Sequence, residues 1–397
     1  MSDAEHWTAA RLNAAGALYT DSPHLGDLTF VHPIFRKANF KDISNADYTL
    51  IGPSLRLASA YLNEPHTLSF WWSLAFAERL HVPRMQRNWQ TREWEDVTGL
   101  NNRERWTKIS ISQHVGRDQL EEINRLFLSM AGCICWEFDE RGGETYGSTI
   151  VVPERWLEAQ GLANNFTSIA LSPKFLAEFR TVAAGTTPED HNSHLRQVFL
   201  LSNTLLHELS HGVILATCDR LESVRDQPAE PFVENDREAE VGYAWEMAMY
   251  GGPPLAIDYR ADCGLGLKAC RWPGMKRATI GDHPYIRPSR RKWEIDWALS
   301  MAWVQPFFTT AYWAQIERFG SSSMKFLKTL GLIFGDYTEE SRRVAASSAW
   351  SSHSNRPDHV DKNFVWRGRR QSRPQERADR QPSKSSRAPR RGRSMSP

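Results

Sequence analysis

The sequence predicts an α+β protein, in which helices and short strands surround one long apolar helix. From residue 195 to residue 215, apolar side chains recur at helical intervals, and no Pro or Gly interrupts them before Gly212. Between residues 105 and 171, short alternating segments predict four strands. The composition, 41% hydrophobic with 16 Trp and 18 Phe, is typical of a globular chain with a large core.

Helices are predicted for much of the first hundred residues. Residues 53–62 and 65–80 each carry a proline near the expected first turn, where its missing N–H does no harm. The second of these segments is rich in large apolar side chains, which we interpret as core rather than as an aromatic binding platform: Trp71, Trp72, Leu74 and Phe76. Residues 1–104 are therefore predicted to form a helical extension that packs on the main body.

Strands and helices alternate in the next segment. Strands are predicted at 105–112, 133–138, 148–152 and 168–171, with an amphipathic helix at 117–130. A short helix at 173–180 and a Gly/Thr/Pro loop then lead into the long apolar helix. Residues 105–217 are predicted to form one domain that contains this helix.

The long helix carries the sequence His207-Glu208-Leu209-Ser210-His211, which has the pattern HExxH. His207 and His211 lie one turn and about 40° apart, so their imidazoles can hold one metal ion. Glu208 is rotated by about 100°, from where it can reach a water on the metal without being a ligand. The alternative is a helix with two ordinary histidines and a surface glutamate, but the surrounding elements favour a metal site.

This order of a strand, a helix, three strands and an HExxH helix resembles the upper subdomain of the zincin metallopeptidases, over roughly residues 105–250. The resemblance implies a mixed β-sheet over an HExxH active-site helix, and a mainly helical lower subdomain. It implies one Zn²⁺ cofactor held by His207 and His211, and Glu208 as the catalytic base in peptide hydrolysis. It also implies that an edge strand, here 168–171, pairs with an extended peptide or protein substrate.

A catalytic zinc site usually has three protein ligands and a water. The metzincin pattern HExxHxxGxxH is excluded, because Ile214 and Thr217 occupy the positions of its Gly and third His. The chain is more similar to the gluzincins, which take a Glu from a following helix. Such a helix is predicted from an Asn235 N-cap to Gly251, and its acidic residues are the candidates: Glu234, Asp236, Glu238, Glu240 and Glu246.

We predict Glu240 as the third ligand, with Asp236 and Glu246 as alternatives. Glu240 is expected inside the helix, where small Ala239 and Gly242 allow a close approach to the HExxH helix. Asp236, one turn earlier, is expected to orient a histidine from behind. Glu246 lies about 240° round the helix from Glu240, so it is expected to point away from the histidine pair. The alternative for all of them is a solvated acidic face.

Helices are also predicted after Gly252. Residues 293–318, bent or broken at Pro306, and residues 322–334 read as helical, so residues 218–360 are predicted to form a helical lower subdomain that includes the third-ligand helix. The resemblance implies a Tyr or His from this half that stabilises the oxyanion. Tyr243, His283 and Tyr285 are candidates, although packing is the simpler role for each.

The net charge of +2 conceals a strongly basic tail. Residues 366–397 contain 11 Lys and Arg against two acidic residues, a net charge of +9, which leaves −7 for the rest. This composition predicts that residues 361–397 are disordered. The tail is a candidate for nucleic-acid binding or nuclear import; the alternative is a solubilising tail without a specific partner.

The sequence predicts a cytoplasmic or nuclear protein without a membrane partner. Its polar, acidic start does not resemble a signal peptide, and no run reaches the roughly 18 apolar residues that a transmembrane helix needs. The five cysteines include no CxxC pair and are expected to be reduced. The predicted function is zinc-dependent peptide hydrolysis. The alternatives are a zincin-scaffold binding protein without turnover, and a nucleic-acid-associated protein acting through its tail.

Overall fold

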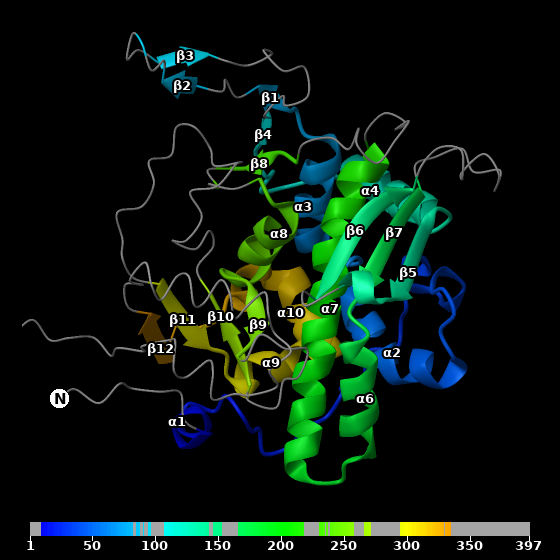
Figure 1. The fold of residues 1–397 in the computed structure, drawn as a ribbon, viewed down its shortest axis with the longest axis vertical. Helices are drawn as coiled ribbons and strands as arrows, with labels where there is room; N and C mark the ends of the chain where they lie inside the picture. The colour runs from blue at the N-terminus through cyan, green and yellow to red at the C-terminus, as the bar shows by residue number, and fades with distance from the viewer. Residues whose placement is uncertain are drawn as a thin grey trace, which may run out of the picture.

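The computed structural model describes residues 9–81, 85–87, 90, 94–96, 107–142, 146–152, 166–217, 230–234, 236, 239–257, 266–270, 294–328 and 330–334. The protein is α+β, as predicted. One long helix, α7, runs through it, with a mixed three-stranded sheet on one side and an antiparallel four-stranded sheet on the other in the view of Figure 1. The basic tail at 361–397 lies outside the described residues, as do His283 and Tyr285.

Helix α7 (Pro188–Thr217) is the predicted HExxH helix, and it is buried on almost every side. A helix that is apolar all round belongs in the interior of a protein. Among the described residues it is the one helix long and apolar enough to cross a membrane, but 89% of its most apolar window is buried inside the protein. Among the helices that pack on it are α2 (Asn45–Tyr61), α3 (Pro65–Phe76), α6 (Lys174–Ala184) and α8 (Val241–Tyr250).

The two helices predicted in the N-terminal segment are present as α2 and α3, but α2 begins at Asn45, so Pro53 lies inside the helix and not in its first turn as predicted. Ser44 caps α2 by accepting a hydrogen bond from the Asp47 N–H, and Pro65 occupies the first turn of α3. Trp71 and Leu74 are buried in the same core as the apolar face of α7, which confirms the core interpretation for these two side chains. The segment therefore packs on the main body through the HExxH helix itself.

The mixed sheet contains three of the predicted strands: β5 (Ile134–Phe138), β6 (Gly147–Val152) and β7 (Phe166–Leu171). Their order is β5-β7-β6, with β7 parallel to β5 and antiparallel to β6. The prediction that 168–171 is an edge strand was wrong, because β7 is central and β6 is the outer strand packed against α7. Chain order does not reveal this, since β7 joins the sheet between two earlier strands.

The predicted strand at 105–112 is the short β4 (Thr107–Ile109), and it does not join the mixed sheet. It pairs with β1 (Leu80–His81) on one side and with β8 (Phe232–Val233) on the other. The expectation that it belongs to the sheet over α7 was therefore wrong. Instead, β4 anchors the chain that follows α7. The predicted amphipathic helix that follows it is confirmed as α4 (Arg117–Met130).

The lower half contains a sheet as well as helices in its described part. It contains an antiparallel sheet in the order β12-β11-β10-β9: β9 (Pro254–Ala256), β10 (Leu267–Ala269), β11 (Glu294–Ala298) and β12 (Leu330–Phe334). The predicted helix at 293–318 begins as β11, and the one at 322–334 ends as β12. Short apolar runs suit a strand or a helix equally well, and here pairing between β11 and β12 decides for the strand.

The break predicted at Pro306 is confirmed. Helix α9 (Met301–Val304) ends before it, a 3-10 turn η5 (Gln305–Phe308) contains it, and α10 (Thr310–Phe319) follows. The remaining short elements are α1 (Ala9–Ala14), η1 (Pro33–Phe35), η2 (Lys37–Asn39), β2 (Met85–Arg87), β3 (Trp94–Asp96), η3 (Glu140–Gly142) and η6 (Ser321–Met324).

Candidate metal centre

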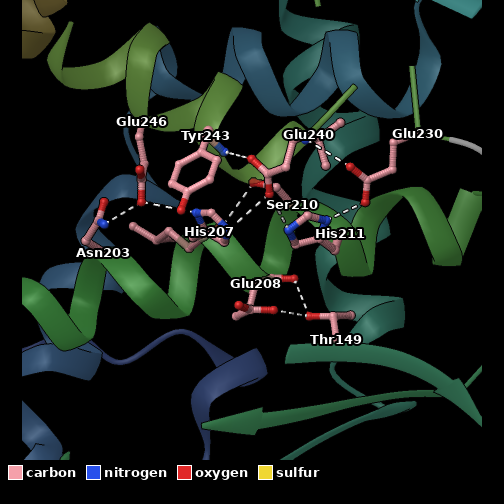
Figure 2. A network of polar contacts seen from close by, with 12 residues as sticks. Thr149, Asn203, His207, Glu208, Ser210, His211, Glu230, Glu240, Tyr243 and Glu246 are labelled. Atoms are coloured by element: carbon pink, nitrogen blue, oxygen red, sulfur yellow. Dashed lines mark hydrogen bonds and ion pairs between the residues drawn. The ribbon is translucent and has the colours of Figure 1, made fainter. Parts of the chain in front are cut away.

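The three residues predicted as metal ligands converge at one point. The Nε2 atoms of His207 and His211 lie 3.2 and 2.9 Å from the same oxygen, Oε1 of Glu240. The three donor atoms all lie within 4.8 Å of one another. Figure 2 shows the two imidazoles side by side on α7, with the carboxylate of Glu240 reaching them from just before the start of α8. Two imidazole nitrogens and a carboxylate oxygen are a donor set that zinc prefers.

Glu240 is not inside the helix, contrary to expectation. Helix α8 begins at Val241, and Glu240 is its N-cap, with extended backbone angles. Its Oε2 accepts a hydrogen bond of 2.5 Å from the N–H of Tyr243, so one oxygen caps the helix while the other faces the histidines. A carboxylate at an N-cap satisfies a first-turn N–H that has no partner within the helix. The expected N-cap Asn235 lies outside the described residues, as does the candidate Glu238.

Two glycines allow the elements to meet closely at the site. A Cβ atom on Gly242 would lie 2.5 Å from Nε2 of His207, so only glycine fits between α8 and this ring. A Cβ on Gly147 of β6 would lie 2.7 Å from the side chain of Glu208. The close approach expected at Gly242 is therefore present, whereas the one at Gly147 had no signal in the sequence.

Glu246 does point at the histidine pair, so the opposite expectation was wrong. Its Oε1 lies 3.1 Å from Nδ1 of His207 and accepts a 2.6 Å hydrogen bond from the side chain of Asn203. An imidazole has nitrogens on opposite edges, so one carboxylate can approach each edge. The expected angle between Glu240 and Glu246 also assumed that both residues lie on the helix. Glu240 precedes α8, so this angle does not apply.

Sequence reasoning missed Glu230, which lies just before β8. Its Oε1 is 2.5 Å from Nδ1 of His211, and its Oε2 accepts a 3.1 Å hydrogen bond from the N–H of Val241. No spacing rule reveals such a residue, because it lies 19 positions after His211 and outside the helix that carries the motif. Asp236, the residue expected to orient a histidine, has no contact with either ring among the described residues. Burial, together with the charges of Glu234 and Glu240, raises its pKa to about 7.

The carboxylates dominate the electrostatics of the cluster. Burial alone would lower the pKa of both imidazoles, but Glu240 and Glu246 raise that of His207 well above 6.5, and Glu230 and Glu240 do the same for His211. In return, the two histidines hold the pKa of Glu240 well below its usual 4.5, against the effect of its burial. The carboxylates therefore favour positive charge on the two imidazoles.

Glu208 lies beside the ligands without being one of them. It is 5% exposed, and its Oε2 accepts a 2.7 Å hydrogen bond from the hydroxyl of Thr149 on β6. Figure 2 shows it on the side of α7 that faces β6, away from Glu240. Together with the three converging residues it lines a cavity of about 550 Å³, which is also lined by Tyr146, Ser148 and Leu255.

The donor set fits zinc, and it fits a catalytic site better than a structural one. A structural zinc is closed by four protein ligands, whereas a catalytic zinc has three and keeps a position for water. Three donors converge here at the wall of an open cavity, with an additional carboxylate nearby.

In comparisons with protein-family models, with curated proteins and with solved structures, no match to this chain was found.

Proposed function

We propose that this protein is a zinc-dependent metallopeptidase of the zincin type, similar to the gluzincins. One observation carries the proposal: His207, His211 and Glu240 converge at the cavity that Glu208 also lines. If the HExxH pattern had arisen on this core helix by chance, nothing would require Glu240 and Glu208 to lie at the same cavity as the two histidines. The mixed sheet lying on α7 agrees with this architecture.

His207, His211 and Glu240 would hold the zinc, through Nε2, Nε2 and Oε1. Each imidazole donates its Nδ1–H to a carboxylate, His207 to Glu246 and His211 to Glu230, which leaves the Nε2 lone pair directed at the metal. The zinc would supply a Lewis acid that lowers the pKa of a water from about 15.7 toward about 7.

Glu208 is the general base of the proposed reaction. It accepts a proton from the attacking water and delivers it to the amine that leaves when the peptide bond breaks. The hydroxyl of Thr149 holds one of its oxygens, which fixes the direction of the other. Tyr243 is a candidate to stabilise the oxyanion, because it lines the same cavity and its ring stands edge-on to His207, with centroids 4.9 Å apart.

The substrate strand is proposed to add to β6. In the described part of the chain β6 has a strand partner on one side only, β7, and its residues Gly147, Ser148 and Thr149 line the cavity. An extended peptide that pairs with an outer strand gains backbone hydrogen bonds without a sequence requirement. A peptide bound in this way would have a peptide bond beside Glu208 and the ligands. In this proposal β6 takes the role that was expected of 168–171.

Peptide hydrolysis by the purified full chain tests the proposal. The wild type, loaded with zinc, should cleave members of a broad peptide library. The Glu208→Gln variant should keep its zinc and lose about 10²-fold or more in rate, because it cannot accept the proton. Glu121→Gln, on the exposed face of α4, is the matched control and should cleave as the wild type does. A zinc-loaded wild type that cleaves no peptide would contradict the proposal and favour a zincin-scaffold binding protein.

A further inference from the structure

We infer that Glu230 is a positioning residue that ties two of the proposed ligands, His211 and Glu240, to each other. The inference rests on the metal site of the proposed function. Glu230 lines the cavity but takes no part in the ligand set, because its two oxygens are engaged elsewhere. Oε1 contacts Nδ1 of His211 at 2.5 Å, and Oε2 accepts from the N–H of Val241 at 3.1 Å.

The second contact connects Glu230 to the other ligand. Val241 is the first residue of α8 and follows directly on Glu240, so its N–H is one of the first-turn donors that lack a partner within the helix. Glu240 caps the same turn through the N–H of Tyr243 and contacts Nε2 of His211. The imidazole of His211 is therefore held between two carboxylates, one on each nitrogen, and both are bonded to the same helix N-terminus (Figure 2).

The position of Glu230 is fixed from outside the site. The residues after it form β8, where Phe232 and Val233 pair with Lys108 and Ile109 of β4 and are 1% and 5% exposed. The N–H of Glu234 donates to the carbonyl of Ile109 at 2.8 Å. Strand β4 therefore sets Glu230 in place, and Glu230 in turn sets the distance between α7 and the start of α8.

Glu246 provides the internal comparison. It contacts Nδ1 of His207 and the side chain of Asn203, both on α7, rather than the first turn of α8. Loss of Glu246 releases the orientation of one ligand, which typically costs about 10- to 100-fold in metal affinity. Loss of Glu230 releases His211 and the N-terminus that carries Glu240, so the effect should be larger.

The experiment measures zinc affinity of the full chain by competition with a chelator, and the absorption spectrum of the cobalt-substituted protein, which reports ligand geometry. Glu230→Ala should weaken zinc by more than about 100-fold and alter the cobalt spectrum. The zinc affinity of Glu230→Gln should lie between those of Glu230→Ala and the wild type. The amide oxygen can still accept one of the two hydrogen bonds, but the NH₂ group cannot accept the other. Glu246→Gln should stay within about 100-fold. Exposed Glu121 on α4, changed to Gln, is the control and should bind as the wild type does.

Two results would overturn the inference alone: zinc affinity in both Glu230 variants within about threefold of the wild type, or a larger loss in Glu246→Gln than in Glu230→Ala. A wild type that binds no zinc would overturn both this inference and the proposed function. If Glu230→Ala does not fold, as seen by its circular dichroism, Glu230→Gln decides the question, because it preserves the size of the side chain.

Discussion

At the scale of single residues, carboxylates determine which nitrogen of each histidine is available to a metal. Glu246 and Glu230 each accept an Nδ1–H, so both rings present Nε2 to Glu240. The HExxH pattern places His207, Glu208 and His211 correctly because one helix carries all three. The partners of the rings come from separate segments, and nothing in the local sequence determines which carboxylate meets which nitrogen.

Thr149→Val tests whether the hydroxyl on β6 positions the base. Valine keeps the shape of threonine but cannot donate to Glu208, so its carboxylate should lose its fixed orientation. We expect kcat for peptide hydrolysis to fall by about 10- to 100-fold with KM and zinc content little changed. Thr149→Ser should recover most of the loss. Equal kcat in the valine variant and the wild type would show that the hydroxyl has no part in catalysis.

His32, far from the candidate metal centre in sequence, should make stability depend on pH. It is 7% exposed and accepts a hydrogen bond from the Ile34 N–H, and burial lowers its pKa from 6.5 to about 4. Between these two pH values the unfolded chain binds a proton that the folded protein does not. The contribution of buried, neutral His32 to the free energy of unfolding is therefore present above pH 6.5 and is lost as the pH falls toward about 4.

The expected loss from His32 is roughly 3 kcal/mol in the free energy of unfolding between about pH 7 and about pH 4. His32→Asn keeps a hydrogen-bond acceptor at the start of η1 but does not titrate. Between the same two pH values, the free energy of unfolding of this variant should therefore fall less than that of the wild type, by the amount that His32 contributes. Urea unfolding at the two pH values measures the difference. Parallel pH dependence in the two proteins would mean that His32 is not buried in its neutral form.

At the scale of elements, the long helix and the strands beside it were predictable, and their pairing was not. Helix α7 has a strong apolar period, and β5, β6 and β7 have clear apolar segments. Which strand is outermost depends on pairing across the sheet, so 168–171 was misplaced. The start of α8 depends on a cap made by Glu240 with its own helix, and the lower sheet depends on strands brought together by distant segments.

Gly242→Ala tests the close contact between α8 and α7. The added methyl carbon would lie 2.5 Å from Nε2 of His207, so the ring or the helix has to move. We expect zinc affinity to fall by at least about 100-fold, because this nitrogen is a proposed ligand. Gly132→Ala is the matched control, since its nearest neighbour would be 3.4 Å away, and it should bind zinc normally. Unchanged affinity in Gly242→Ala would show that the two helices are farther apart.

At the scale of the whole molecule, the site depends on segments that are far apart in the chain. Helices α2 and α3 pack on α7 and share its core, β4 pairs with the strand that follows Glu230, and α8 supplies Glu240. The domain boundaries predicted at residues 104 and 217 therefore separate elements that contact one another around the candidate metal centre. The hydrophobic composition predicted a large core, but the assembly of these segments results from tertiary packing.

Zinc content of the purified chain tests the central claim most directly. The wild type should carry about one zinc per chain, removable by a chelator, because two imidazoles and a carboxylate converge. His207→Ala, His211→Ala and Glu240→Ala should be metal-poor at micromolar zinc, since each removes one of three protein bonds. Asp236→Ala should keep its zinc. Unchanged zinc in the His207→Ala/His211→Ala double variant would contradict the account.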